Sequence, residues 1–347
     1  MRILTFIIVL LISIVPCFAS EKNITATERN EIIDEVIDNL ANKYVDPNLG
    51  KKTAALIKQK KEQNAYDSLN QKSKLIQALI TDMHKATNDK HLQLVDPKGF
   101  DQAPPDGSTQ TRPIIQVFNP NATSQSDIKQ NKLIQEMFKR MNYGLKDAKI
   151  LDGNIGYLDI RQFTSPGMAP EVFQAIDKAM KSFQDCSGII LDLRLCSAGG
   201  DPEVTMYVAS YFLGGDKPEL LYELYDRENK KIKEFRTRPD IAGKYQPDMP
   251  LYILVSAKTF SAGEMFAYGL QKIGRAKIVG ETSAGAAHET NTIGIGHGIM
   301  MVLPVNRLVH AKTETNWQGT GVVPDVSAKA DDALNVAKDQ ILKQLKR

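Results

Sequence analysis

The chain has 347 residues, with 44 Lys and Arg residues against 41 Asp and Glu residues and a formal net charge of +3. With 42% hydrophobic and 24% charged residues, it is long enough for one large or two moderate globular domains, and its composition excludes a disordered, collagen-like or multi-span membrane protein. A nearly balanced charge gives no electrostatic reason to expect binding to nucleic acid. Composition alone does not separate an enzyme from a binding protein.

The first twenty residues have the pattern of a secretory signal peptide. Arg2 is their only charge, Ile3–Val15 is an apolar run, and the small residue Ala19 stands at the expected cleavage site. The run is short for a membrane span. A signal anchor and a lipoprotein acylated at Cys17 are the alternatives. We therefore expect cleavage of residues 1–19 and export to the periplasm or the extracellular space, with membrane contact only through the signal segment.

The exported chain is expected to begin with a small helical unit over residues 20–95. Thr25-x-x-Glu28 has the pattern of a capping box ahead of apolar residues at helical spacing. A second, mostly polar helix is expected around 51–62, and a third helix with an apolar stripe follows it. A break at 87–90 then leads to the alternating segment His91–Val95, which predicts a strand that ends this unit.

Residues 96–149 are expected to form a loop or linker and a helix, because 96–126 is rich in Pro, Gly, Ser, Thr, Gln and Asn. From 150 to 347, strand and helix patterns alternate, which predicts a sheet with helices packed on it. Strands are expected near 155–160, 187–193, 220–226, 251–256, 277–279, 299–303 and 306–311, and helices near 168–184, from Pro202, near 262–273 and at 330–345.

Two cysteines remain after signal cleavage, Cys186 and Cys196. The segment between them predicts a buried strand, whose ends lie roughly 26 Å apart, whereas the Cα atoms of a disulfide lie within about 7 Å. We therefore predict two free thiols.

Ser261 is a candidate catalytic residue. A buried-strand run at 250–255 and a short turn lead into Ser261-Ala262-Gly263-Glu264 and an apolar helix. This order places the serine hydroxyl at a helix N-terminus, where free backbone N–H groups and the positive end of the helix dipole can hold a developing oxyanion. The same four residues fit a capping box, in which the serine only satisfies a backbone N–H. Spacing alone favours the cap and leaves both interpretations open.

A serine nucleophile needs a base, and the chain has five histidines. Their spacing matches no zinc signature, so we expect no metal and no cofactor. His91 opens a strand just past a turn, and His288 follows a loop of small residues. Position alone does not choose between them.

Six segments in a fixed order carry a resemblance to a known family. They are Asp89-Lys90-His91-Leu92, 153–158, 190–194 with Gly199-Gly200, 259–264, 279–282, and 316–319 through 321–325. In this order they resemble the C-terminal processing (tail-specific) protease family, and more closely its branch with the tricorn core protease and the retinoid-binding protein modules. The resemblance implies a crotonase-like or ClpP-like α/β core behind a small N-terminal helical unit. The stretch from the His91 strand to residue 150 is too short for a PDZ domain.

The resemblance also implies roles for single residues. Ser261 would be the nucleophile and His91 the general base. The oxyanion hole would consist of the N–H of Ala262 and a backbone N–H at Gly199 or Gly200.

Three positions depart from the family pattern. Ala286 stands where the processing branch has a lysine base, which makes a Ser–Lys dyad unexpected and strengthens the case for His91. Gln318 stands where the tricorn-like branch has a glutamate that orients the histidine. An amide can hold the ring but cannot stabilise the imidazolium. Cys196 stands where the family usually has asparagine, and a plain buried thiol is the simpler interpretation.

Three glutamates are alternatives for the missing carboxylate: Glu281, Glu289 and Glu314.

The resulting expectation is an exported serine peptidase that hydrolyses peptide bonds in peptide or protein substrates through a Ser261 acyl-enzyme. A homo-oligomer is compatible with the sequence. The alternative is a catalytically weak or inactive binder of peptides or hydrophobic ligands on the same scaffold, which the amide at Gln318 and the retinoid-binding relatives keep open.

Overall fold

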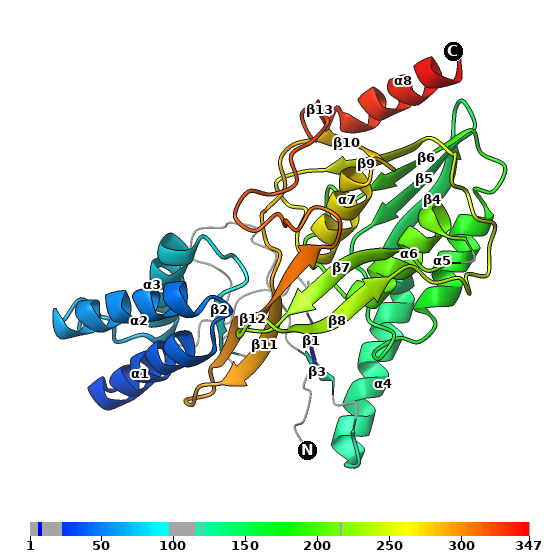
Figure 1. The fold of residues 1–347 in the computed structure, drawn as a ribbon. Helices are drawn as coiled ribbons and strands as arrows, with labels where there is room; N and C mark the ends of the chain where they lie inside the picture. The colour runs from blue at the N-terminus through cyan, green and yellow to red at the C-terminus, as the bar shows by residue number, and fades with distance from the viewer. Residues whose placement is uncertain (1–5, 9–22, 97–115, 119–120, 216, 347) are drawn as a thin grey trace. The chain divides into compact units, whose positions relative to one another are not determined.

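The computed structural model describes residues 6–8, 23–96, 116–118, 121–215 and 217–346. The chain forms two compact units: unit 1 comprises 1–119, 225–230 and 288–307, and unit 2 comprises 120–224, 231–287 and 308–347 (Figure 1). Most of the expected signal segment and of the expected loop at 96–126 lies outside the described residues. In the described part of the chain, no helix has the length and apolar character that crossing a membrane requires.

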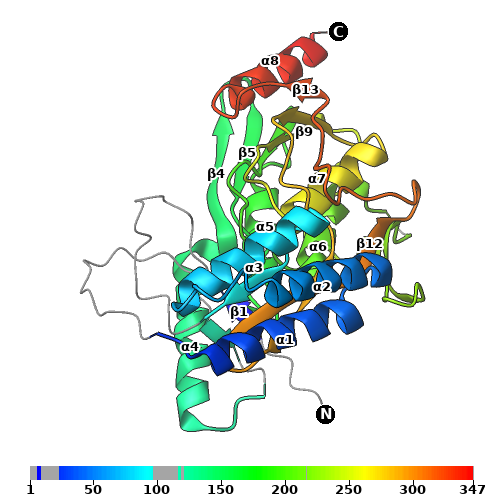
Figure 2. The ribbon, with the colours of Figure 1, turned by 90° about the vertical axis from the view of Figure 1, so that its left-hand side faces the viewer.

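Three helices form most of unit 1: α1 (Ala26–Lys43), α2 (Pro47–Glu62) and α3 (Lys72–Thr87), which lie side by side (Figure 2). The predicted capping box starts α1, because the Glu28 N–H donates to Thr25 Oγ1 at 3.1 Å and the Thr25 N–H donates to Glu28 Oε2 at 2.7 Å. The apolar stripes of the three helices are buried against one another and confirm the helical N-terminal segment.

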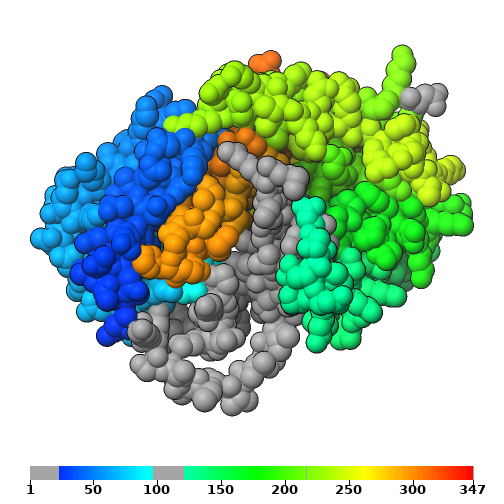
Figure 3. Space-filling model, turned by 90° about the horizontal axis from the view of Figure 1, so that it is seen from below, coloured from blue at the N-terminus to red at the C-terminus, as the bar shows by residue number. Residues whose placement is uncertain are grey.

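A hairpin from the second half of the chain completes the core of unit 1. Strand β12 (Met300–His310) pairs antiparallel with β11 (Glu289–Gly294) and with β2 (Gln93–Val95). Figure 3 shows this hairpin beside α1, and His297 Nε2 at its turn donates a 2.8 Å hydrogen bond to Glu31 of that helix. The N-terminal sequence segment and the hairpin thus share one hydrophobic core.

Two predicted strands differ from the observed ones. The segment His91–Val95 is a strand only over Gln93–Val95, because α3 ends at Asn88 in the left-handed conformation and the chain is still turning at His91. The strands expected at 299–303 and 306–311 are one continuous strand, β12. A further short strand, β1 (Phe6–Ile8), pairs antiparallel with β3 (Gln116–Phe118).

Unit 2 is built on a six-stranded sheet in the order β13-β10-β9-β6-β5-β4. Five strands are parallel and β4 is antiparallel at one edge. The strands are β4 (Leu145–Leu151), β5 (Ile155–Ile160), β6 (Gly188–Asp192), β9 (Leu251–Val255), β10 (Lys277–Gly280) and β13 (Val326–Ser327). The remaining elements are α4 (Gln125–Arg140), the 3-10 turn Asn142–Gly144, α5 (Val172–Lys181), α6 (Pro202–Leu213), β7 (Leu220–Tyr225), β8 (Lys231–Arg236), α7 (Ala262–Lys272) and α8 (Ala333–Leu345).

Helices cover both faces of this sheet. Side chains of α5, α6 and α7 join the larger core cluster on one face, and Ala333, Ala337 and Ile341 of α8 pack on the other. Strands β5, β6 and β9 are buried along their whole length, as expected for parallel strands between two helical layers. The mixed α/β fold predicted from the sequence is therefore confirmed.

Candidate active site

Ser261 lies in the loop that joins the carboxyl end of β9 to α7. Its backbone has φ 50° and ψ −114°, a region that costs a non-glycine residue roughly 1–3 kcal/mol, and it is not the extended conformation of an ordinary N-cap. Side-chain hydrogen bonds brace the loop, since Thr259 Oγ1 donates to the Leu193 carbonyl at 2.8 Å and accepts the Ser256 N–H at 2.9 Å. The surrounding structure thus holds this serine in a strained conformation at the start of a helix.

The glycine pair lies directly against Ser261. Gly199 has φ +65°, and a Cβ atom on it would lie 2.7 Å from Ser261 Cβ and 3.1 Å from Ser261 Oγ. Gly200 has φ +140°, and a Cβ there would lie 2.1 Å from the Phe163 carbonyl oxygen. Glycine is therefore required at both positions, because a side chain would displace the serine or the neighbouring backbone.

The residues predicted to form the oxyanion hole lie next to Ser261 in the chain or in space. Ala262 is the first residue of α7, so its N–H belongs to the open end of the helix. The Gly199 N–H is directed at the Cys196 thiol. The Gly199 N–H is therefore already engaged by that thiol.

Cys196 is a structural residue beneath this site. Burial, and then the charges of Asp159 and Glu264, raise the pKa of its thiol to about 12, so it is not a thiolate at neutral pH. Cys186 is also buried, and both thiols are free, as predicted.

Glu264 organises the loops around Ser261, although it is not among the candidate site residues predicted from the sequence. Its carboxylate accepts hydrogen bonds from the Ser261 N–H (2.9 Å), Ser283 Oγ (2.6 Å), the Gly285 N–H (2.6 Å) and the Ala286 N–H (3.0 Å). Burial raises the pKa of Glu264, although these four donors act against that rise. In the sequence, the capping-box pattern predicts only the hydrogen bond from the Ser261 N–H to Glu264, and none of the other three.

Gln318 holds the carboxyl end of the loop of small residues that precedes His288. Its Oε1 accepts the Ala287 N–H at 2.8 Å, and the neighbouring Trp317 donates its indole N–H to the Ala286 carbonyl at 2.8 Å. Ser261, Ala262, Gly199, Gly200 and Gln318 all belong to unit 2.

His91, the predicted base, belongs to unit 1 and lies in a buried polar cluster there. Asp89 Oδ1 accepts the His91 N–H at 3.0 Å, and Asp89 Oδ2 lies 2.8 Å from His288 Nδ1 and accepts the Tyr44 hydroxyl at 3.0 Å. Burial, opposed by the charge of Asp89, lowers the pKa of His91 to about 4, so its imidazole is neutral at pH 7. A neutral imidazole is the form that can accept a proton.

The other three histidines have structural surroundings. His84 Nε2 is 2.7 Å from the Leu92 carbonyl, His297 pairs with Glu31, and His310 is buried edge-on against the Tyr222 ring. Within the described ranges, no group of three or more His, Cys, Asp or Glu side chains is arranged to hold a metal ion.

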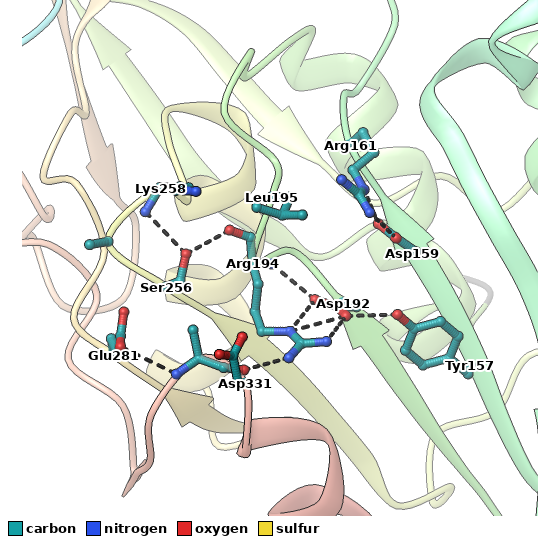
Figure 4. Close-up of a pocket in the computed structure, with 12 residues that line it drawn as sticks. Tyr157, Asp159, Arg161, Asp192, Arg194, Leu195, Ser256, Lys258, Glu281 and Asp331 are labelled. Atoms are coloured by element: carbon teal, nitrogen blue, oxygen red, sulfur yellow. Dashed lines mark hydrogen bonds and ion pairs between the residues drawn. The ribbon is translucent and has the colours of Figure 1, made fainter. Parts of the chain in front are cut away.

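A pocket of about 330 Å³ opens at the carboxyl ends of the parallel strands of unit 2 (Figure 4). Inside it, Arg194 pairs with Asp192 at 2.6 Å and Arg161 pairs with Asp159 at 2.6 Å. Tyr157 also donates its hydroxyl to Asp192 at 2.7 Å. Because each arginine is paired with an aspartate, the charges of this pocket largely compensate one another. Glu281, one of the three alternative carboxylates, lines it, whereas Ser261, His91 and Gln318 do not.

Comparison with known proteins identifies the family of the chain. The family model of peptidase family S41 matches residues 154–328, and the model of the N-terminal domain of peptidase S41 in eukaryotic IRBP matches 21–140. The carboxy-terminal-processing protease of Bartonella bacilliformis is 29% identical over 182 residues, which are 51% of this chain and 39% of that protein. The carboxy-terminal processing protease CtpA of Bacillus subtilis is 27% identical over 186 residues, 53% of this chain and 37% of that protein.

The fold comparison extends over more of the chain. The crystal structure of the tricorn protease covers 92% of this chain with a TM-score of 0.53 at 13% sequence identity, and the match covers 37% of that protein. Fold and family matches together define a protein of the serine-type peptidase class. The chain belongs to peptidase family S41, and it spans about two fifths of the length of the curated relatives it matches.

Proposed function

We propose that the chain is an exported serine peptidase that cleaves peptide bonds in peptide or protein substrates through an acyl-enzyme on Ser261. The observation that carries the proposal is the strained Ser261 at the N-terminus of α7, with Gly199 packed against its side chain. An ordinary helix cap needs neither the strain nor the close glycine. Family membership supports the reaction type, and the apolar run at Ile3–Val15 supports export.

In the proposed reaction His91 accepts the proton of Ser261 Oγ while the oxygen attacks the substrate carbonyl carbon. The oxyanion forms against the N–H groups of Ala262 and Gly200, with Gly199 as the other glycine candidate. His91 then gives the proton to the leaving amine as the peptide bond breaks. Water, deprotonated by His91, releases the acyl group and regenerates Ser261.

The test is hydrolysis of a mixed peptide library by the chain purified from the exported fraction. The mass of that purified chain should correspond to a protein that begins at Ser20. The unchanged protein should generate new N-termini, and Ser261→Ala should lose this activity by at least about 1,000-fold. Ser165→Ala, which removes a buried serine hydroxyl that donates to Asp201, is the control for folding. Equal cleavage by the unchanged protein and Ser261→Ala would refute the assignment.

The alternative, a non-catalytic binder, rests on the amide at Gln318. It predicts saturable binding of peptides or hydrophobic ligands without any Ser261-dependent cleavage.

A further inference from the structure

Asp89 lies at the centre of the buried cluster in unit 1 and is fully enclosed, with 0% exposure. It follows the left-handed Asn88 that ends α3, and its own N–H donates to Thr87 Oγ1 at 3.1 Å. One carboxylate oxygen faces His91, whose Nδ1 is 3.7 Å away, and the other faces His288 Nδ1 at 2.8 Å. A single carboxylate thus faces two imidazole rings. One of them, His288, is 199 residues away from Asp89 in the sequence.

The charge of this carboxylate follows from its neighbours. Burial would raise the pKa of Asp89, but the hydrogen bond and charge of His288, and then the charge and backbone N–H of His91, outweigh burial and lower it. The pKa of Tyr44 is raised by burial, then by the charge and hydrogen bond of Asp89 and by the charge of Asp46. Its hydroxyl therefore keeps its proton and remains a donor. Asp89 is therefore ionised at neutral pH and accepts hydrogen bonds through both oxygens.

Gln318 supplies no negative charge at the position where the tricorn-like branch has a glutamate. Its Oε1 accepts the Ala287 N–H instead. In a serine protease with a carboxylate-oriented histidine, an amide in place of the carboxylate lowers kcat by roughly 10⁴-fold, because it fails to orient the ring and stabilise the imidazolium. A peptidase built on this chain needs its carboxylate from elsewhere.

We propose that Asp89 is this carboxylate: it orients the His91 base and stabilises the imidazolium, while His288 and Tyr44 hold Asp89 in position. The inference rests on the proposed function. The proton of Ser261 passes to His91 and then to the leaving amine, and Asp89 stays ionised throughout. Asp89 acts through His91, so it is a positioning residue.

The deciding variant is Asp89→Asn, measured by kcat, KM and the pH dependence of kcat/KM on the best peptide from the library. We expect kcat to fall by at least about 100-fold with KM within about threefold, because orientation and charge are lost while substrate binding is kept. The acid limb of kcat/KM should move to lower pH, because an imidazole without a neighbouring carboxylate loses its proton more readily. Asp89→Glu should recover part of the rate.

A matched control separates this role from loss of structure. Asp82 is also a buried aspartate of unit 1 that accepts a tyrosine hydroxyl, from Tyr66 at 2.7 Å, so Asp82→Asn should lower stability without moving the acid limb. A separate test is Gln318→Glu: a large gain of kcat would show that the missing carboxylate belongs at residue 318 and not at Asp89.

The outcomes are distinguishable. Full activity of Asp89→Asn, an unmoved acid limb in that variant, or a large gain of kcat in Gln318→Glu overturns the role of Asp89 and leaves the peptidase assignment intact. An unchanged protein without Ser261-dependent cleavage overturns the proposed function and, with it, the role of Asp89.

Discussion

At the residue scale, the contact between Gly199 and Ser261 makes a direct prediction. In Gly199→Ala the new methyl group would lie 2.7 Å from Ser261 Cβ, so it must displace the serine or the loop. We expect kcat/KM for peptide hydrolysis to fall by at least about 100-fold, since about 1 Å of displacement in a catalytic group costs that much.

Gly274→Ala is the matched control for this change. Gly274 has a similar φ of +77°, but no heavy atom lies within 4 Å of the position that a Cβ would take there, so the variant carries the backbone strain without the clash. It should lose about 1 kcal/mol of stability and keep its activity. Equal activity losses in both variants would show that strain, and not contact with Ser261, is responsible.

The residues of the site differ in how far they were predictable. Ser261, Gly199 and Gly200 follow parallel strands in the sequence, and the carboxyl ends of parallel strands meet at one edge of a sheet, so their proximity was foreseeable. Asp89 and His288 are far apart in the sequence, and their contact depends on the packing of the hairpin against the helices. Local patterns carry no information on such a contact.

At the element scale, the start of α7 depends on the four hydrogen bonds that Glu264 accepts. Glu264→Gln replaces one acceptor oxygen by an NH₂ group that must face two donors. We expect a loss of about 2–4 kcal/mol in the free energy of unfolding, measured by urea denaturation, and a reduced kcat because the Ser261 and Ala286 loops loosen.

Glu281→Gln is the control, since Glu281 has a hydrogen bond of 3.2 Å to the Ala330 N–H and lies outside the Ser261 loop. It should stay within about 1 kcal/mol of the unchanged protein. A comparable loss in both variants would remove the special role of Glu264.

The elements themselves were predicted unevenly. The buried strands β5, β6 and β9 have continuous apolar runs and were found within one or two residues. Strand β8 is largely exposed, β11 is half exposed, and both are polar and give no strand signal. Pro304 divided the pattern of β12, but the ladder continues past it with a register shift opposite Glu289 and Thr290.

At the scale of the whole molecule, the chain passes between the two units five times, which no local sequence signal indicated. Unit 2 holds the proposed nucleophile and oxyanion donors, and unit 1 holds the proposed base with Asp89 and His288. Each unit has its own hydrophobic core.

The account depends most on Ser261 being an activated nucleophile, and labelling with a fluorophosphonate probe measures this directly. The serine oxygen displaces fluoride from phosphorus, so intact-protein mass spectrometry should show one adduct per chain on Ser261 in the folded protein. Ser261→Ala and the heat-denatured protein should carry none. Absence of the adduct on the folded protein, or an equal adduct on Ser261→Ala, would contradict the account.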